Sequence, residues 1–152
     1  LKPLYTLTLL DDPGLGEPLF ERVLSDLEDL PFGSYEELNA FTVLLETGKI
    51  YEQSGHFSHS LKFTTKVAEL IARSVNIDDF LETESSPEAK ERLLRKVTCL
   101  SEAYIQLAQL NQRHDRDRAL EAARAALEVT KRYFLGAKQE AKIEGLISSI
   151  EK

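Results

Sequence analysis

The chain has 152 residues, of which 42% are apolar and 30% charged, and its net charge is −7. These values exclude a disordered chain and indicate one globular domain with its own core. The single Cys99 excludes an internal disulfide, and no apolar run approaches the roughly 20 residues that a helix needs to cross a bilayer. The chain begins with Leu and contains no Met, so we expect a piece of a longer cytoplasmic or nuclear protein.

The acidic charge is concentrated at the start of the chain. Residues 1–55 hold eleven acids and three bases, a net charge of −8, whereas residues 56–152 carry +1. Neither part attracts a phosphate backbone, so we expect no nucleic-acid partner, and we expect no membrane contact. An acidic surface can steer a basic protein partner, although an ordinary solvated helix face gives the same charge pattern.

Apolar residues recur at helical spacing along the first half of the chain. The first predicted helix covers 18–30. Ser34 and Glu37 form a capping-box pattern that opens a second helix, and Gly55 is the residue expected to end it in the left-handed conformation. A third helix is predicted over 57–74.

In the second half, the polar and acidic residues 76–86 predict a loop. A proline start indicates a fourth helix over 87–112, and a charged turn separates it from an Ala-rich helix over 118–135. Gly136 is expected to close that helix, and a last one covers 137–151. The pattern therefore predicts an all-α fold of about six or seven helices without a strand.

The segment from Phe41 to Ser74 spans 34 residues and combines large, small and aromatic side chains at fixed spacings. The residues that carry the pattern are Phe41, Leu44, Gly48, Tyr51, Gly55, Phe57 and Ser60. This pattern resembles a tetratricopeptide repeat. Small residues at Gly48 and Ser60 let two antiparallel helices approach closely, and Tyr51 fills the gap between them. Departures from the repeat are Thr47, Thr64 and Ala72.

A second stretch resembles the same repeat. Residues 103–108 look like the start of its first helix, and residues 118–129 like its second. The two units start about sixty residues apart, whereas adjacent repeats start 34 apart. A generic helical bundle without repeat ancestry is the alternative. The resemblance divides one domain into an N-terminal extension or cap (1–33), a first pair (34–75), an acidic loop (76–86), a second pair (87–135) and a C-terminal helix (137–151).

The resemblance implies a curved α-solenoid whose first helices line a groove for a peptide or helix of another protein. The groove positions carried over to this sequence are Thr42, Leu45, Lys49, Glu52 and Gln53 from the first unit, and Glu102, Ile105, Gln109, Gln112 and Arg113 from the second. Leu45, Lys49 and Gln109 do not match the residues with which the family's chaperone-tail binders hold a terminal carboxylate. Each position is a groove contact or simply an exposed helix residue.

The sequence carries no catalytic constellation. His56 and His59 lie at a spacing that can bind a metal, but no further ligand lies near them in sequence. Cys99 sits within an apolar helical pattern, which indicates a buried, inert thiol. No nucleotide-binding or metalloprotease motif is present, so we expect no cofactor, no metal and no enzyme.

The leading hypothesis is therefore a non-catalytic scaffold or adaptor module that belongs to a larger complex subunit. The alternative from another class is a helical regulatory domain of a larger enzyme or transcription regulator.

Overall fold

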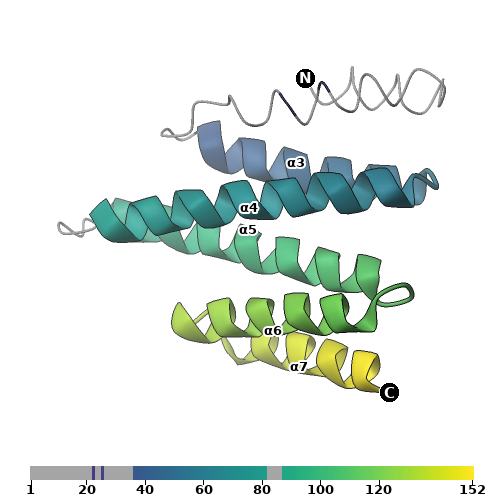
Figure 1. The fold of residues 1–152 in the computed structure, drawn as a ribbon. Coiled ribbons are helices and arrows are strands. Elements are labelled where there is room, and N and C mark those ends of the chain that lie inside the picture. Colours follow the sequence, from purple (N-terminus) through teal and green to yellow (C-terminus); the bar gives the residue numbers. More distant parts are fainter. Residues whose placement is uncertain (1–21, 23–24, 26–35, 82–86) are drawn as a thin grey trace. The chain divides into compact units, whose positions relative to one another are not determined.

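The computed structural model describes residues 22, 25, 36–81 and 87–152. In this part of the chain the fold is all-α, with helices that pack against one another and no strand (Figure 1). The helices are α3 (Glu36–Gln53), α4 (Phe57–Leu81), α5 (Pro87–Asn111), α6 (Arg116–Arg132) and α7 (Ala137–Glu151). The predicted fold class is confirmed at this level, with five helices in the described ranges where six or seven were expected for the whole chain.

Several expectations fall on residues outside the described ranges. They are the helix over 18–30, apart from Arg22 and Ser25, which are helical and exposed, the capping box at Ser34, and the loop over 82–86.

The third predicted helix was placed too short. We expected it to end at residue 74, but α4 continues to Leu81. Ser74 and Val75 are both buried, so the packed face of the helix continues beyond the predicted end. Residues 76–81 contain no Gly or Pro that would stop a helix, and their acidic composition alone does not do so.

The chain divides into two compact units, Leu1–Leu70 and Ile71–Lys152, and the boundary falls within α4. In the first unit, α3 and the start of α4 approach closely through small residues. The Ser60 hydroxyl, fully buried, donates a 2.7 Å hydrogen bond to the backbone carbonyl of Gly48. A larger side chain at either position would separate the two backbones, so the predicted role of these small residues is confirmed.

Tyr51 fills the space between the same two helices. Its side chain is buried, and its ring packs edge-on against Phe63, with the ring centroids 5.4 Å apart. Edge-to-face packing is a favoured arrangement of two aromatic rings, which adds to the energy of burying them. The expected role of Tyr51 is therefore confirmed, and this aromatic pair is central to the core of the first unit.

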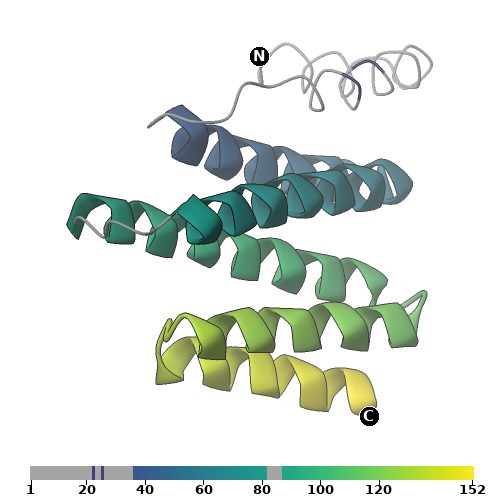
Figure 2. The ribbon, with the colours of Figure 1, turned by 60° about the vertical axis from the view of Figure 1, so that its left-hand side comes forward.

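In the second unit α5, α6 and α7 lie side by side in alternating directions (Figures 1 and 2). Ala119, Ala123 and Ala126 form a fully buried stripe on α6, at the spacing that places them on one helix face. They pack with Ala108 and Ile105 of α5 and with apolar side chains of α7. Because the alanine side chain is small, α6 packs closely against both α5 and α7.

A buried polar network also joins these three helices. The Thr130 hydroxyl donates to the carbonyl of Ala126 at 2.7 Å and lies 3.0 Å from the Ser101 hydroxyl. Since Thr130 has only one hydroxyl hydrogen, Ser101 donates to Thr130 and can accept from the Gln139 amide at 3.3 Å. The same amide donates to Glu102 at 3.1 Å. The network therefore specifies how α5, α6 and α7 align, because each buried hydroxyl has a partner.

Two helices end in the same backbone motif. After α3, the N–H of His56 donates to the carbonyl of Tyr51, and that of Gly55 to the carbonyl of Glu52. After α6, the N–H of Leu135 donates to Thr130 and that of Phe134 to Lys131. Both are Schellman motifs, in which one residue takes a left-handed conformation.

The left-handed residues of these motifs are Gly55, with φ +82°, and Phe134, with φ +55°. The expectation for Gly55 is confirmed. Gly136 was expected to close the helix predicted over 118–135, but α6 already ends at Arg132 and Gly136 is the N-cap of α7.

Candidate partner-binding surface

The predicted groove positions of the first unit lie on one face of α3. Thr42, Lys49, Glu52 and Gln53 are exposed, whereas Leu45 is buried. Leu45 therefore belongs to the core of the first unit, and the exposed positions at the end of α3 are polar. Whether they bind a partner stays a prediction.

The predicted groove positions of the second unit lie on α5 and, for Gln112 and Arg113, in the turn that follows it, and three of them contact α7. The Glu102 carboxylate is 3.6 Å from the Lys142 ammonium, and the Gln112 amide donates to the Ser149 hydroxyl at 3.0 Å. Ile105 is buried and packs in a cluster with Ala126 and Ile143. Gln109 and Arg113 remain exposed. Three of the five positions therefore contact α7, and the other two, Gln109 and Arg113, are exposed.

The contacts between α5 and α7 have a nearly constant offset in sequence. Residues joined by hydrogen bonds at both ends of the pair lie 37 or 38 positions apart. A constant offset means that the two helices run parallel, with α6 antiparallel between them (Figure 2). The offset is close to the 34-residue period of the repeat that the sequence resembles.

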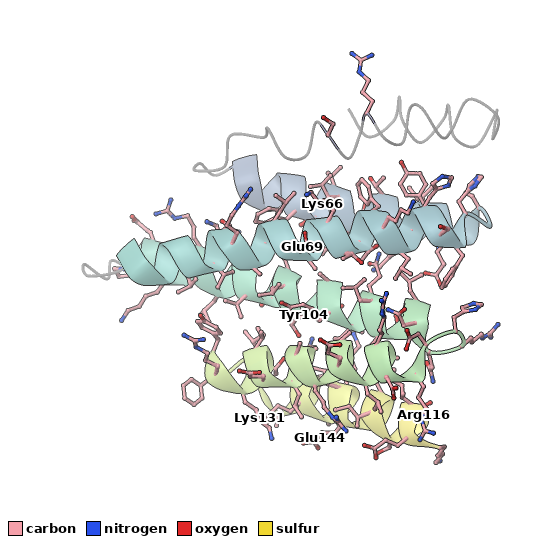
Figure 3. The ribbon with its side chains drawn as sticks, in the orientation of Figure 1. Lys66, Glu69, Tyr104, Arg116, Lys131 and Glu144 are labelled. Carbon is pink, nitrogen blue, oxygen red and sulfur yellow. The ribbon has the colours of Figure 1, made fainter. Side chains whose placement is uncertain are left out.

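The far end of α7 is fixed by arginines from α6. The Arg116 guanidinium donates to the backbone carbonyl of Glu151, and that of Arg124 lies 3.7 Å from the Glu151 carboxylate. Figure 3 shows Arg116 and Lys131 at opposite ends of α6. Gln109 and Arg113 therefore belong to the end of the second unit where α5 connects to α6, and Lys131 to the end where α6 connects to α7.

The environment of Tyr104 clearly shifts the pKa of its phenol. Burial raises the pKa of the Tyr104 phenol above its ordinary value of 10.0, and the nearby Glu128 carboxylate raises that pKa further. Both effects disfavour the tyrosinate, so the phenol stays protonated at neutral pH and offers no base or nucleophile there.

The candidate metal ligands and the cysteine do not assemble a reactive site. The His56 and His59 ring centroids lie 5.5 Å apart. No group of three or more His, Cys, Asp or Glu side chains is placed to hold a metal ion within the residues that the structure describes. Cys99 forms no disulfide and is half-buried, where we expected a buried thiol. None of the described helices is long and apolar enough to cross a membrane.

The sequence reasoning missed the most unusual surface residue. Phe134 is 90% exposed and adopts a left-handed conformation between α6 and α7. The end of this helix was predicted at Gly136 because glycine is the usual residue type at a helix end. Lys131 and Arg132 in the last turn of α6 are the cue that was overlooked, because basic residues favour a helix C-terminus.

A scan against protein-family models and searches of curated proteins and solved structures found no match for this chain. Function is therefore inferred from the geometry described above.

Proposed function

We propose that this chain is a non-catalytic protein-interaction module built from tetratricopeptide-like helix pairs, and that it serves a larger complex as scaffold or adaptor. The observation that carries the proposal is the offset of 37 or 38 residues between the parallel helices α5 and α7. Stacking of helix pairs at a near-constant period is the construction principle of α-solenoids. The close approach at Gly48 and Ser60 supports the same construction in the first unit.

In such a stack, the first helix of one pair lies beside the first helix of the next, and the remaining face of each lines a groove. In the second unit α7 takes the neighbouring position and leaves Gln109 and Arg113 exposed. In the first unit Lys49, Glu52 and Gln53 are exposed. Each set is the candidate contact surface of its own unit for a peptide or helix of a partner protein.

The experiment that tests this function is a charge reversal of the candidate groove. The double variant Lys49→Glu/Arg113→Glu changes one basic groove position in each unit. The matched control Lys62→Glu/Lys90→Glu makes the same change in charge at exposed positions outside the proposed groove. Partners of the tagged chain are cross-linked and identified by mass spectrometry.

We expect the groove variant to lose a defined partner that the control variant retains, with the helical circular dichroism of both unchanged. Equal recovery of every partner by wild type, groove variant and control would remove the groove from consideration. Loss from both variants would indicate a general charge effect and contradict the assignment to these residues.

A further inference from the structure

The turn between α6 and α7 carries an exposed aromatic residue in a conformation that its side chain disfavours. Phe134 has φ +55° and is 90% exposed. A β-carbon clashes with the backbone in the left-handed region, and for this reason glycine is the usual residue at this position of a Schellman motif. A bulky residue with positive φ is a true outlier in proteins. The ring also gains almost nothing from burial here, so the folded chain gives no account of why Phe occupies the position.

The side chains around Phe134 share one sign of charge. Residues 131–138 contain Lys131, Arg132 and Lys138 and no acid. All three basic residues are exposed. The Arg132 guanidinium lies over the Tyr133 ring, 5.4 Å from its centroid, which keeps this cation at the turn. Neither Lys131 nor Lys138 forms an ion pair with a side chain in the described ranges.

We propose that this basic aromatic corner, defined as Lys131, Arg132, Phe134 and Lys138, binds an acidic peptide segment that carries at least one large apolar side chain. The three cations are complementary to carboxylates, and the exposed ring supplies an apolar contact that becomes buried on binding. A ring held by a fixed turn loses little conformational freedom when a ligand covers it. The strain at Phe134 is then retained because the ring is needed for binding.

A protein segment fits the corner better than a lipid surface does. The chain carries −7 overall, which opposes approach to an anionic bilayer. Phe134 is the one large apolar side chain among the four residues of the corner, so a single ring would have to anchor it. A stable membrane anchor needs more apolar area than a single ring supplies.

The corner is separate from the groove positions of the second unit. Lys131 lies at the end of α6 opposite Arg116 (Figure 3), whereas Gln109 and Arg113 belong to the Arg116 end. Either surface can bind its partner if the other does not.

The test starts from a library of short random peptides displayed on phage and selected on the full chain. The affinity of the selected peptides is then measured for the wild-type chain and for the corner variant Lys131→Glu/Lys138→Glu. The control Lys62→Glu/Lys152→Glu carries the same charge change at exposed positions that are not part of the corner. We expect the selected peptides to be acidic and to contain a large apolar residue. Their dissociation constant should rise about tenfold or more for the corner variant and stay unchanged for the control.

A second variant separates the ring from the charges. Phe134→Gly removes the ring and relieves the left-handed strain, so we expect weaker peptide binding together with a melting temperature about 2–4 °C higher. The proposal would be overturned if the selected peptides lacked acidic residues. It would also be overturned if their dissociation constants were the same for the wild-type chain and for both variants. Phe134-dependent binding to phosphatidylserine vesicles, with no enrichment of acidic peptides, would overturn it in favour of a membrane contact.

Discussion

The two Schellman turns of this chain use the same hydrogen bonds with opposite residue choices. At the end of α3 the left-handed position is Gly55, and at the end of α6 it is Phe134. In both turns the residue whose carbonyl accepts the outer hydrogen bond is buried and contacts a neighbouring helix. Tyr51 packs its ring on Phe63, and Thr130 bonds its hydroxyl to Ser101. The turns therefore differ mainly at the one position where backbone strain is decided.

Only the turn after α3 has the residue type that gives the left-handed conformation its greatest stability. Gly55 has the residue type that the backbone conformation favours, whereas Phe134 has one that opposes it. The second turn is nevertheless well defined, because contacts on both sides of it fix the helices it connects. Strain of this kind persists only where the surrounding structure determines the conformation, and it commonly marks a functional position.

The largest expected effect concerns the anchor of the second turn. Thr130→Val keeps the shape of the side chain but removes the hydroxyl that receives the Ser101 hydrogen bond. A fully buried Ser101 would be left without this partner, so we expect a loss of about 2 kcal/mol in the free energy of unfolding, measured by urea denaturation. The matched control is Thr98→Val, whose hydroxyl bonds only within its own exposed turn and should change stability little. Equal losses in both variants would contradict the anchoring role.

The next effect is expected when the turn after α3 is given the residue type of the turn after α6. Gly55→Phe places an aromatic residue at φ +82°, so we expect the free energy of unfolding to fall by about 1–2 kcal/mol. Gly145→Ala is the control, because a β-carbon there meets nothing within 4 Å and the position is helical. That control should gain about 0.5–1 kcal/mol. If Gly55→Phe is neutral, the left-handed position of these turns does not discriminate between side chains.

A smaller effect of opposite sign is expected when the strain is removed. Phe134→Gly should raise the free energy of unfolding by roughly 1 kcal/mol, because relief of the left-handed strain exceeds the added entropy of the unfolded chain. Urea denaturation with an unchanged slope measures the gain. A loss of stability would mean that the exposed ring makes a contact that compensates for its conformation.

The smallest effect concerns Tyr104 of α5, whose pKa is raised in part by Glu128, two residues before Thr130 on α6. The raised pKa of Tyr104 means that its ionisation disfavours the folded chain. The stability linked to this phenol is complete below pH 10 and is lost as pH rises from 10 through the raised value. Tyr104→Phe should change stability little at pH 7 and make its decline above pH 10 less steep. Parallel stability curves for wild type and Tyr104→Phe above pH 10 would contradict this origin.

Much of the fold could be predicted because helices leave local signals in a sequence. The Gly48 and Ser60 contact followed from small residues at a family spacing, and the turn at Gly55 from glycine's tolerance of positive φ. The end of α4 was misplaced because polar composition was taken for a loop, although nothing in the chain stops the helix before Leu81. Local sequence does not encode how far tertiary packing extends a helix.

The candidate surface was harder to predict for a related reason. The groove positions of the second unit were taken from the resemblance to the repeat, but the position of α7 against them depends on contacts between residues more than thirty positions apart. Ile105 and Gln112 look equally exposed on a helical wheel, and only tertiary packing buries one and gives the other a partner. Phe134 was missed because the glycine two residues later is the more typical helix end, and the basic last turn of α6 was not weighed against it.

The central claim is that Phe134 lowers the stability of the folded chain and contributes to the binding of an acidic peptide. The most direct measurement compares Phe, Leu, Asn and Gly at position 134, and determines for each the free energy of unfolding and the affinity for one selected acidic peptide. The account predicts opposite orders: stability rises from Phe through Asn to Gly, whereas affinity falls along the same series and Leu retains part of it. If stability and affinity rise together, or if affinity is the same for all four residues, the claim is wrong.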